Sequence, residues 1–234
     1  MINIPAQYSY TILSACIFLI WIIFFLLNKI FRKRQIILSS IFMIFGPLSE
    51  ALFIPDYWHP ITIWSLPIFK SYMSPEDLIF CFSMIGIIAS FNNLAFDRPR
   101  AKDAAISWNA IGYLLICTAA LSAACVLLWL AGINSIFATS LGMVGVAAAV
   151  MLWARDIRLI YPALAGAVFV PILLFGLYWT GFKSVENSEA ILKSIWSLYG
   201  TRLGVRLAGV PLTELLWGAS FGFVFSTLFS RFKI

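Results

Sequence analysis

Residues 74–96 read SPEDLIFCFSMIGIIASFNNLAF, an apolar run that opens on two adjacent acids, Glu76 and Asp77. About 20 mostly apolar residues are enough for an α-helix to cross the hydrocarbon core of a bilayer. The run therefore predicts a membrane-spanning helix with two carboxyl groups in its first turn. Carboxylates at membrane depth are costly, so they usually mark function.

The whole chain has the composition of a membrane protein. Its 234 residues are 62% hydrophobic and only 11% charged, with a mean hydropathy of +0.96, whereas soluble domains carry about 25% charged residues. The fold class that we predict is an all-α integral membrane bundle of seven helices. The apolar runs that give these helices cover residues 9–30, 36–54, 75–96, 107–131, 135–153, 158–180 and 205–230.

Basic residues lie mainly on one side of these runs, and this asymmetry predicts the orientation of the bundle. The richer side is expected to be cytoplasmic. We therefore predict a multi-pass protein of the bacterial inner membrane, with its N-terminus outside and its C-terminus in the cytoplasm. The same pattern explains the net charge of +6, so no nucleic acid partner is expected. Eleven basic residues lie on the richer side (Lys29, Arg32, Lys33, Arg34, Arg98, Arg100, Lys102, Arg155, Arg158, Arg231 and Lys233) and five on the other (Lys70, Lys183, Lys193, Arg202 and Arg206).

A second acidic motif resembles the first. Residues 211–217 read PLTELLW, and both motifs read carboxylate, Leu, aliphatic, aromatic when they are aligned on Asp77 and Glu214. Trp58 lies 19 residues before Asp77, and Trp196 lies 18 residues before Glu214. The pattern predicts two parallel three-helix repeats, because an odd number of spans separates the copies. The predicted repeats are residues 1–104 and 133–234, joined by a spacer helix in residues 105–132.

Acids in or near the spans are the candidate catalytic residues. Glu50 lies in PLSEALF, residues 47–53, which shares the P-x-x-E-x-L-aromatic pattern found around Glu214. A carboxyl group in a dry pocket, with a second one nearby, stays protonated more readily and can act as an acid. The candidate catalytic residues are Glu50, Glu76, Asp77 and Glu214.

Helix capping is the structural alternative for two of these acids. Ser74 and Pro75 precede Glu76 and Asp77, in the order that a helix N-terminus favours. Glu214 is expected two to three turns inside its helix, where capping does not explain it.

Aromatic residues are dense around these acids and in the two long connectors, residues 55–74 and 181–204. Aromatic faces stabilise cations, so an acid that protonates an alkene beside such a wall suits cyclisation of an isoprenoid. Ordinary packing is the simpler explanation for most of the aromatic residues individually. The predicted substrate-binding residues are Trp58, Phe80, Trp196 and Trp217.

These motifs resemble those of the membrane lycopene cyclase domain family, which occurs as heterodimers and as fused tandem repeats. The matching stretches are residues 74–80 and 209–217, with Trp58 and Trp196 upstream of them. The resemblance covers the chain as two copies.

The resemblance implies a three-helix repeat, a linear carotenoid or other polyprenyl substrate, and acid/base roles for Glu76, Asp77 and Glu214. Two positions depart from the P-x-E-E-like motif of the family. Ser74 replaces the proline of the first motif, and Thr213 replaces the first acid of the second.

Three other kinds of protein share parts of this pattern. A non-enzymatic membrane binding or proton-coupled transport protein would use buried carboxylates as proton relays, and it stays open as the alternative. A polyprenyl transferase would need a D-x-x-x-D-like magnesium site, whereas Asp97 and Asp103 are six residues apart beside basic residues. A retinal photoreceptor would need a lysine in the last span, which contains none.

No cofactor is expected. Cyclisation of an isoprenoid end is an isomerisation, so no electrons need to be supplied, and the chain has no G-x-G-x-x-G dinucleotide motif. The single histidine, His59, excludes a multi-histidine metal site within one chain. The expected partners are membrane lipid and the substrate, and association with further copies of the chain is left open.

Overall fold

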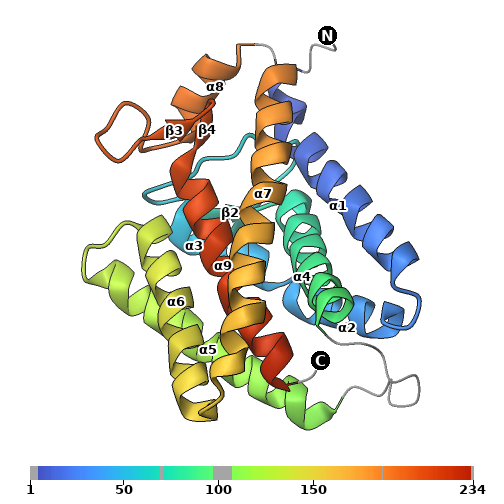
Figure 1. The fold of residues 1–234 in the computed structure, drawn as a ribbon. Coiled ribbons are helices and arrows are strands. Elements are labelled where there is room, and N and C mark those ends of the chain that lie inside the picture. Colours follow the sequence, from blue (N-terminus) through green and yellow to red (C-terminus); the bar gives the residue numbers. More distant parts are fainter. Residues whose placement is uncertain (1–4, 69–70, 97–106, 186, 233–234) are drawn as a thin grey trace.

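Long apolar helices make up most of the computed structural model (Figure 1), which describes residues 5–68, 71–96, 107–185 and 187–232. Among these residues, seven helical segments are long and apolar enough to cross a membrane. The predicted number of spans is therefore confirmed, and the chain is a multi-pass membrane protein. The segments are Ser9–Leu27 (α1), Arg32–Phe53 (α2 and α3), Pro75–Ala95 (α4), Trp108–Leu130 (α5), Ser135–Ala154 (α6), Ile157–Ser184 (α7 with a preceding 3-10 turn) and Leu212–Phe232 (α9).

The second span, predicted as one apolar run over residues 36–54 with a possible kink at Pro47, is broken just before that proline, which lacks an amide hydrogen and crowds the carbonyl four residues earlier. Helix α2 covers Arg32–Phe42 and α3 covers Phe45–Phe53. A carbonyl released by the break, that of Phe42, accepts a hydrogen bond from the Cys81 thiol at 3.2 Å. A Cβ on Gly46 would lie 2.5 Å from the Asp77 carbonyl oxygen. Glycine at position 46 therefore lets α3 approach α4 closely.

A β-hairpin leads into each of the two most enclosed helices. Strands β1 (Leu66–Ile68) and β2 (Ser71–Met73) pair antiparallel before α4. Strands β3 (Arg206–Leu207) and β4 (Val210–Pro211) pair antiparallel before α9.

The turn of the second hairpin explains why the last helix starts late. Ala208 and Gly209 both have positive φ, 49° and 91°, as the tight two-residue hairpin turn requires. The predicted span over residues 205–230 was therefore wrong at its start, because 206–211 form the hairpin and the helix begins at Leu212. Each strand of this hairpin has only two residues, which is too short to show the alternation of polar and apolar residues that identifies a strand in a sequence.

Helices α4 and α9 form the centre of the bundle (Figure 1). Helix α4 packs mainly on α1 and α2, and α9 packs mainly on α7 (Ile160–Ser184) and α6, while α4 and α9 also contact each other. A Cβ on Gly222 would lie 2.0 Å from the Gly166 carbonyl oxygen. Small residues thus allow α9 and α7 to pack backbone to backbone, as is common between membrane helices.

The segments that precede α4 and α9 pair with each other. Trp58 and Trp196 form an isolated antiparallel bridge. The His59 amide donates to the Ile195 carbonyl at 2.8 Å, and the Ser197 amide donates to the Tyr57 carbonyl at 2.9 Å. The short helix α8 (Ser188–Ile195) leads into this pairing.

Basic residues separate to the two ends of the bundle. The α1–α2 turn, the α6–α7 junction and the end of α9 carry the described members of the richer group, while α8 and the β3–β4 hairpin lie at the opposite end (Figure 1). Which end faces the cytoplasm stays a prediction. Arg98, Arg100, Lys102, Lys233 and Lys70, and the predicted boundary at residues 104–105, lie outside the described residues.

Candidate functional site

A cavity of about 420 Å³, here called the central cavity, lies among α3, α4, α5, α6 and α9. Three of the predicted catalytic acids line it: Glu50 from α3, Asp77 from α4 and Glu214 from α9. Lysine, arginine and histidine are absent from the residues assigned to its lining, within the part of the chain that the structure describes. The wall is otherwise largely aromatic and aliphatic, including Phe42, Phe45, Phe53, Trp58, Phe80, Trp217, Phe221 and Phe225.

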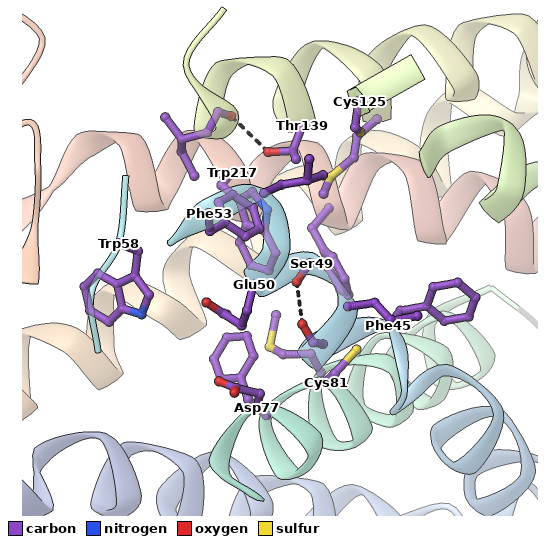
Figure 2. Close-up of a pocket in the computed structure, with 18 of the residues that line it drawn as sticks. Phe45, Ser49, Glu50, Phe53, Trp58, Asp77, Cys81, Cys125, Thr139 and Trp217 are labelled. Carbon is purple, nitrogen blue, oxygen red and sulfur yellow. Dashed lines mark hydrogen bonds between the residues drawn. The ribbon is translucent and has the colours of Figure 1, made fainter. Parts of the chain in front are cut away.

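Glu50 has the least satisfied carboxyl group in this wall. It lies in the last turn of α3 and is 7% exposed. Its Oε2 atom is buried and has no hydrogen-bond partner among the described residues. Figure 2 shows the Glu50 carboxyl group among the side chains of Trp58, Phe53 and Asp77. A polar atom buried without a partner is costly, so this arrangement points to a group kept for chemistry or binding.

Asp77 caps its own helix as well as lining the cavity. Ser74 donates from its backbone nitrogen, at 2.7 Å, and from its hydroxyl, at 2.9 Å, to Asp77 Oδ2. The Asp77 amide donates back to Ser74 Oγ at 3.4 Å, which completes a capping box. Tyr10 from α1 donates its hydroxyl to Oδ1 at 2.7 Å. The capping alternative for Asp77 is thus present, together with a bond to a distant helix.

Glu214 is held by two tyrosines. The Tyr57 hydroxyl donates to Oε1 at 2.5 Å, and the Tyr178 hydroxyl from α7 donates to Oε2 at 3.1 Å. Burial, with the nearby Glu214 charge, raises the pKa of the Tyr57 phenol well above its ordinary value. Tyr57 therefore stays protonated over the physiological pH range and keeps donating its hydrogen bond to the Glu214 carboxyl group.

The expected depth of Glu214 in its helix was wrong. It is the third residue of α9, because the helix starts at Leu212 rather than near residue 205. Its neighbour Thr213 lies 3.0 Å from the Tyr57 hydroxyl. The residue that departs from the family motif thus contacts the tyrosine that holds Glu214.

Glu76 points away from the central cavity. The Thr11 hydroxyl of α1 donates to its Oε1 at 2.6 Å, and Ser14 Oγ donates to its backbone carbonyl at 3.3 Å. Glu76 is 5% exposed and does not belong to the cavity lining, although its Oε2 atom, like that of Glu50, is buried without a hydrogen-bond partner among the described residues. Its predicted acid/base role stays a prediction, and the observed contacts are those of a residue that joins α4 to α1.

The predicted substrate-binding aromatic residues divide into two groups. Trp58, Phe80 and Trp217 line the central cavity, and the Phe80 and Trp217 ring centroids are 6.3 Å apart. Trp196 is 1% exposed and belongs instead to a second, smaller core cluster. The structure thus places Trp196 behind the wall rather than on it.

Sequence reasoning missed three tyrosines, Tyr10, Tyr57 and Tyr178, which bond to the acids. They are separated from their partners by 67, 157 and 36 residues. The predicted topology contained a usable signal, because it puts Tyr10 and Tyr178 at the outer ends of their spans, level with the acids. A phenol at that depth in an apolar run needs a partner.

Among the described residues, no group of three or more His, Cys, Asp and Glu side chains could hold a metal ion. Asp97 and Asp103 lie outside the described residues. The predicted absence of a cofactor stays a prediction.

No family model, curated protein or solved structure matches this chain. The case for a function therefore depends on the site itself. The site combines one acid that has an unpartnered oxygen with two acids that accept hydrogen bonds from hydroxyl groups. Its wall is largely aromatic, and none of the described residues that line it is basic.

Proposed function

We propose that this chain is an integral membrane isomerase that cyclises the end of a linear isoprenoid polyene, as lycopene cyclases do. The observation that carries the proposal is the Glu50 carboxyl group, buried with an unpartnered oxygen in an aromatic cavity. Such a group in its neutral form can deliver a proton to a double bond of a hydrocarbon, which has no polar functional group on which an enzyme could act.

The reaction balances without an oxidant or a metal. Glu50 gives its proton to one carbon of the terminal double bond, which leaves a cation on the other. The electron pair of a nearby double bond then forms the ring bond and moves the cation. A neighbouring carbon loses a proton to a carboxylate, for which Asp77 and Glu214 are the candidates. One proton enters and one leaves, so product and substrate have the same mass.

The wall fits the charge that this reaction develops. Phe80 and Trp217 face the cavity as a close pair, and Phe221 stacks on Trp217 with centroids 5.2 Å apart. A cation over an aromatic face is stabilised by about 0.5–2 kcal/mol or more when water is excluded. Several faces around one cavity would guide a cation through ring closure.

The proposal includes the two parallel repeats. Asp77 and Glu214 are both the third residue of a helix that follows a hairpin. The two hydrogen bonds beside the Trp58–Trp196 bridge are also equivalent. In each, the residue after one tryptophan donates its amide to the carbonyl of the residue before the other tryptophan. Both observations support a local two-fold axis along the membrane normal.

Expression in a lycopene-accumulating host tests the proposal. The wild-type protein is expected to convert lycopene into a ringed pigment of equal mass, which chromatography of the lipid extract would resolve. Glu50→Gln keeps the shape of the side chain but has no acidic proton, so it should leave lycopene unchanged. Unchanged lycopene with wild-type protein that is folded in the membrane would reject this function.

One observation favours the alternative of proton-coupled transport. Tyr10, Trp58 and Tyr178 line both the central cavity and a second pocket of about 50 Å³. Since Tyr10 and Tyr178 each donate to an acid of the central cavity, they could relay protons between the two spaces. Proton flux into vesicles that contain the purified protein, followed with a pH-sensitive dye, would favour transport over cyclisation.

A further inference from the structure

Three residues that line the central cavity are exposed, whereas the rest of its lining is buried or half-buried. Leu48 of α3 is 45% exposed and Val126 of α5 is 38% exposed, and Ser122 of α5 is exposed as well. All three belong to the cavity lining. Highly exposed side chains in the wall of an otherwise buried cavity indicate the place where the cavity opens.

The connection lies between helices that are not each other's main partners. Helix α3 packs mainly on α4 and β2, and α5 packs mainly on α6 and α9. Both helices belong to candidate membrane spans, so an opening between them would face lipid rather than water.

We infer that the central cavity opens sideways into the membrane between α3 and α5, and that the hydrocarbon chain of the substrate enters through this opening. The inference rests on the proposed function for the identity of the chain. It adds the route and the binding mode: one end of the chain reaches Glu50 while the rest stays in the bilayer.

The chemistry of the opening suits a hydrocarbon. Leu48 and Val126 are aliphatic, and the Ser122 hydroxyl donates to the Thr118 carbonyl within α5 at 3.0 Å. The opening therefore presents little free hydrogen-bonding capacity, whereas the acids lie in the interior. A polar solute would lose its hydration there without compensation, and an apolar chain would lose nothing on leaving lipid.

The size of the cavity leads to the same binding mode. A volume of about 420 Å³ is near the lower end of the range for ligand pockets, about 300–1,000 Å³. It accommodates the end of a long polyene rather than the whole molecule. A chain that is partly inside must pass through a wall, and the opening between α3 and α5 provides the passage.

The test uses lycopene as the probe and blocks the opening with an indole. Ser122→Trp and Val126→Trp are each made in the Glu50→Gln protein, which on the proposed mechanism binds substrate without converting it. The matched controls are Ala123→Trp and Leu127→Trp, which are exposed on the same helix but do not line the cavity. Each protein is purified from lycopene-accumulating cells, and bound lycopene is measured by absorbance per protein.

We expect lycopene to remain with Glu50→Gln and with both controls, and to be lost from both blocked variants. Equal retention by blocked and control proteins would overturn the opening, and so would the absence of lycopene from all of them. The same four tryptophan variants are also made in the wild-type protein, which keeps Glu50. Product formation by these proteins, measured in parallel, tests the proposed function separately. Bound lycopene that is lost on blocking, without any ring formation, would support the opening and reject the cyclase.

Discussion

Asp77 and Glu214 occupy the same position in two different helices, and each accepts a hydrogen bond from a tyrosine of another helix. Glu50, from the broken second span, has no such partner for its Oε2 atom among the described residues. The three acids of the central cavity thus differ in how they are held. This difference leads to separate expectations for their variants.

Glu214→Gln should abolish turnover while the protein stays folded in the membrane. The amide is close in shape to the carboxyl group but cannot exchange a proton with substrate, and general acid–base catalysis contributes about 10²–10⁴-fold. Product formation in membranes is the measurement, and the elution profile in size-exclusion chromatography is the control for folding. Full activity would leave Glu214 with a structural role alone.

Tyr57→Phe should destabilise the protein, because it leaves Glu214 Oε1 without its 2.5 Å donor. A buried group that loses its hydrogen-bond partner costs about 1–3 kcal/mol. Thermal unfolding in detergent measures the effect. The matched control is Tyr199→Phe, which removes a hydroxyl bonded to the exposed Glu189 and should change stability by less than about 0.5 kcal/mol. Equal stability of the two variants would contradict the buried network.

Asp77 variants should separate capping from chemistry. Asp77→Asn keeps an oxygen that can accept from Ser74, so the helix start should survive while turnover is lost. Asp77→Ala also removes the capping box and should cost about 1 kcal/mol more in stability. Parallel measurements of activity and melting temperature distinguish the two effects. An active Asp77→Asn protein would show that capping is the whole role of the residue.

The predicted orientation can be tested with reporter fusions. The asymmetry of basic residues, eleven against five, predicts that residues 33 and 156 lie in the cytoplasm and that residues 65 and 190 lie outside. Cytoplasmic signals at both residues 65 and 190 would reverse the predicted orientation. A cytoplasmic signal at residue 190 with an external signal at residue 65 would be incompatible with two parallel repeats, since the two acidic motifs would then face opposite sides.

The spans could be read from the sequence because hydropathy acts over about 20 residues at a time. The end of the Trp108–Leu130 helix, for example, falls within one residue of the prediction. The break between α2 and α3 could not be read in this way. The turn near Met43 is as apolar as its surroundings, but it lies four residues before Pro47, which has no amide hydrogen and crowds the carbonyl of residue 43 in a helix.

The acids of the site were predictable, but their partners were not. A carboxyl group within an apolar segment has a high free-energy cost in a membrane. Glu50 and Glu214 could therefore each be identified from their local sequence alone. Tyr57 lies 157 residues from Glu214, and nothing local in the sequence links them. Trp196 matched its counterpart Trp58 in spacing, yet only Trp58 lines the cavity, whereas Trp196 is enclosed in the smaller core cluster against which Trp58 also packs.

Turnover should need no added metal, nucleotide or reductant, because the proposed cyclisation moves protons and no electrons. Purified protein is expected to be colourless without substrate. Activity should be the same in chelator-treated samples and in samples that contain divalent cations. Stoichiometric flavin in the purified protein, or activity that stops when a reduced cofactor is withheld, would contradict the mechanism.

The position of α5 separates two properties that many enzymes combine in one wall. The acids belong to α3, α4 and α9. Leu48, on one side of the opening, belongs to α3 as Glu50 does, whereas Ser122 and Val126 on the other side belong to α5, which contains no acidic residue. Changes along one face of α5 would therefore alter which chains are admitted and leave the proton-transfer groups intact. Selectivity could thus diverge, in evolution or by engineering, without rebuilding the chemistry.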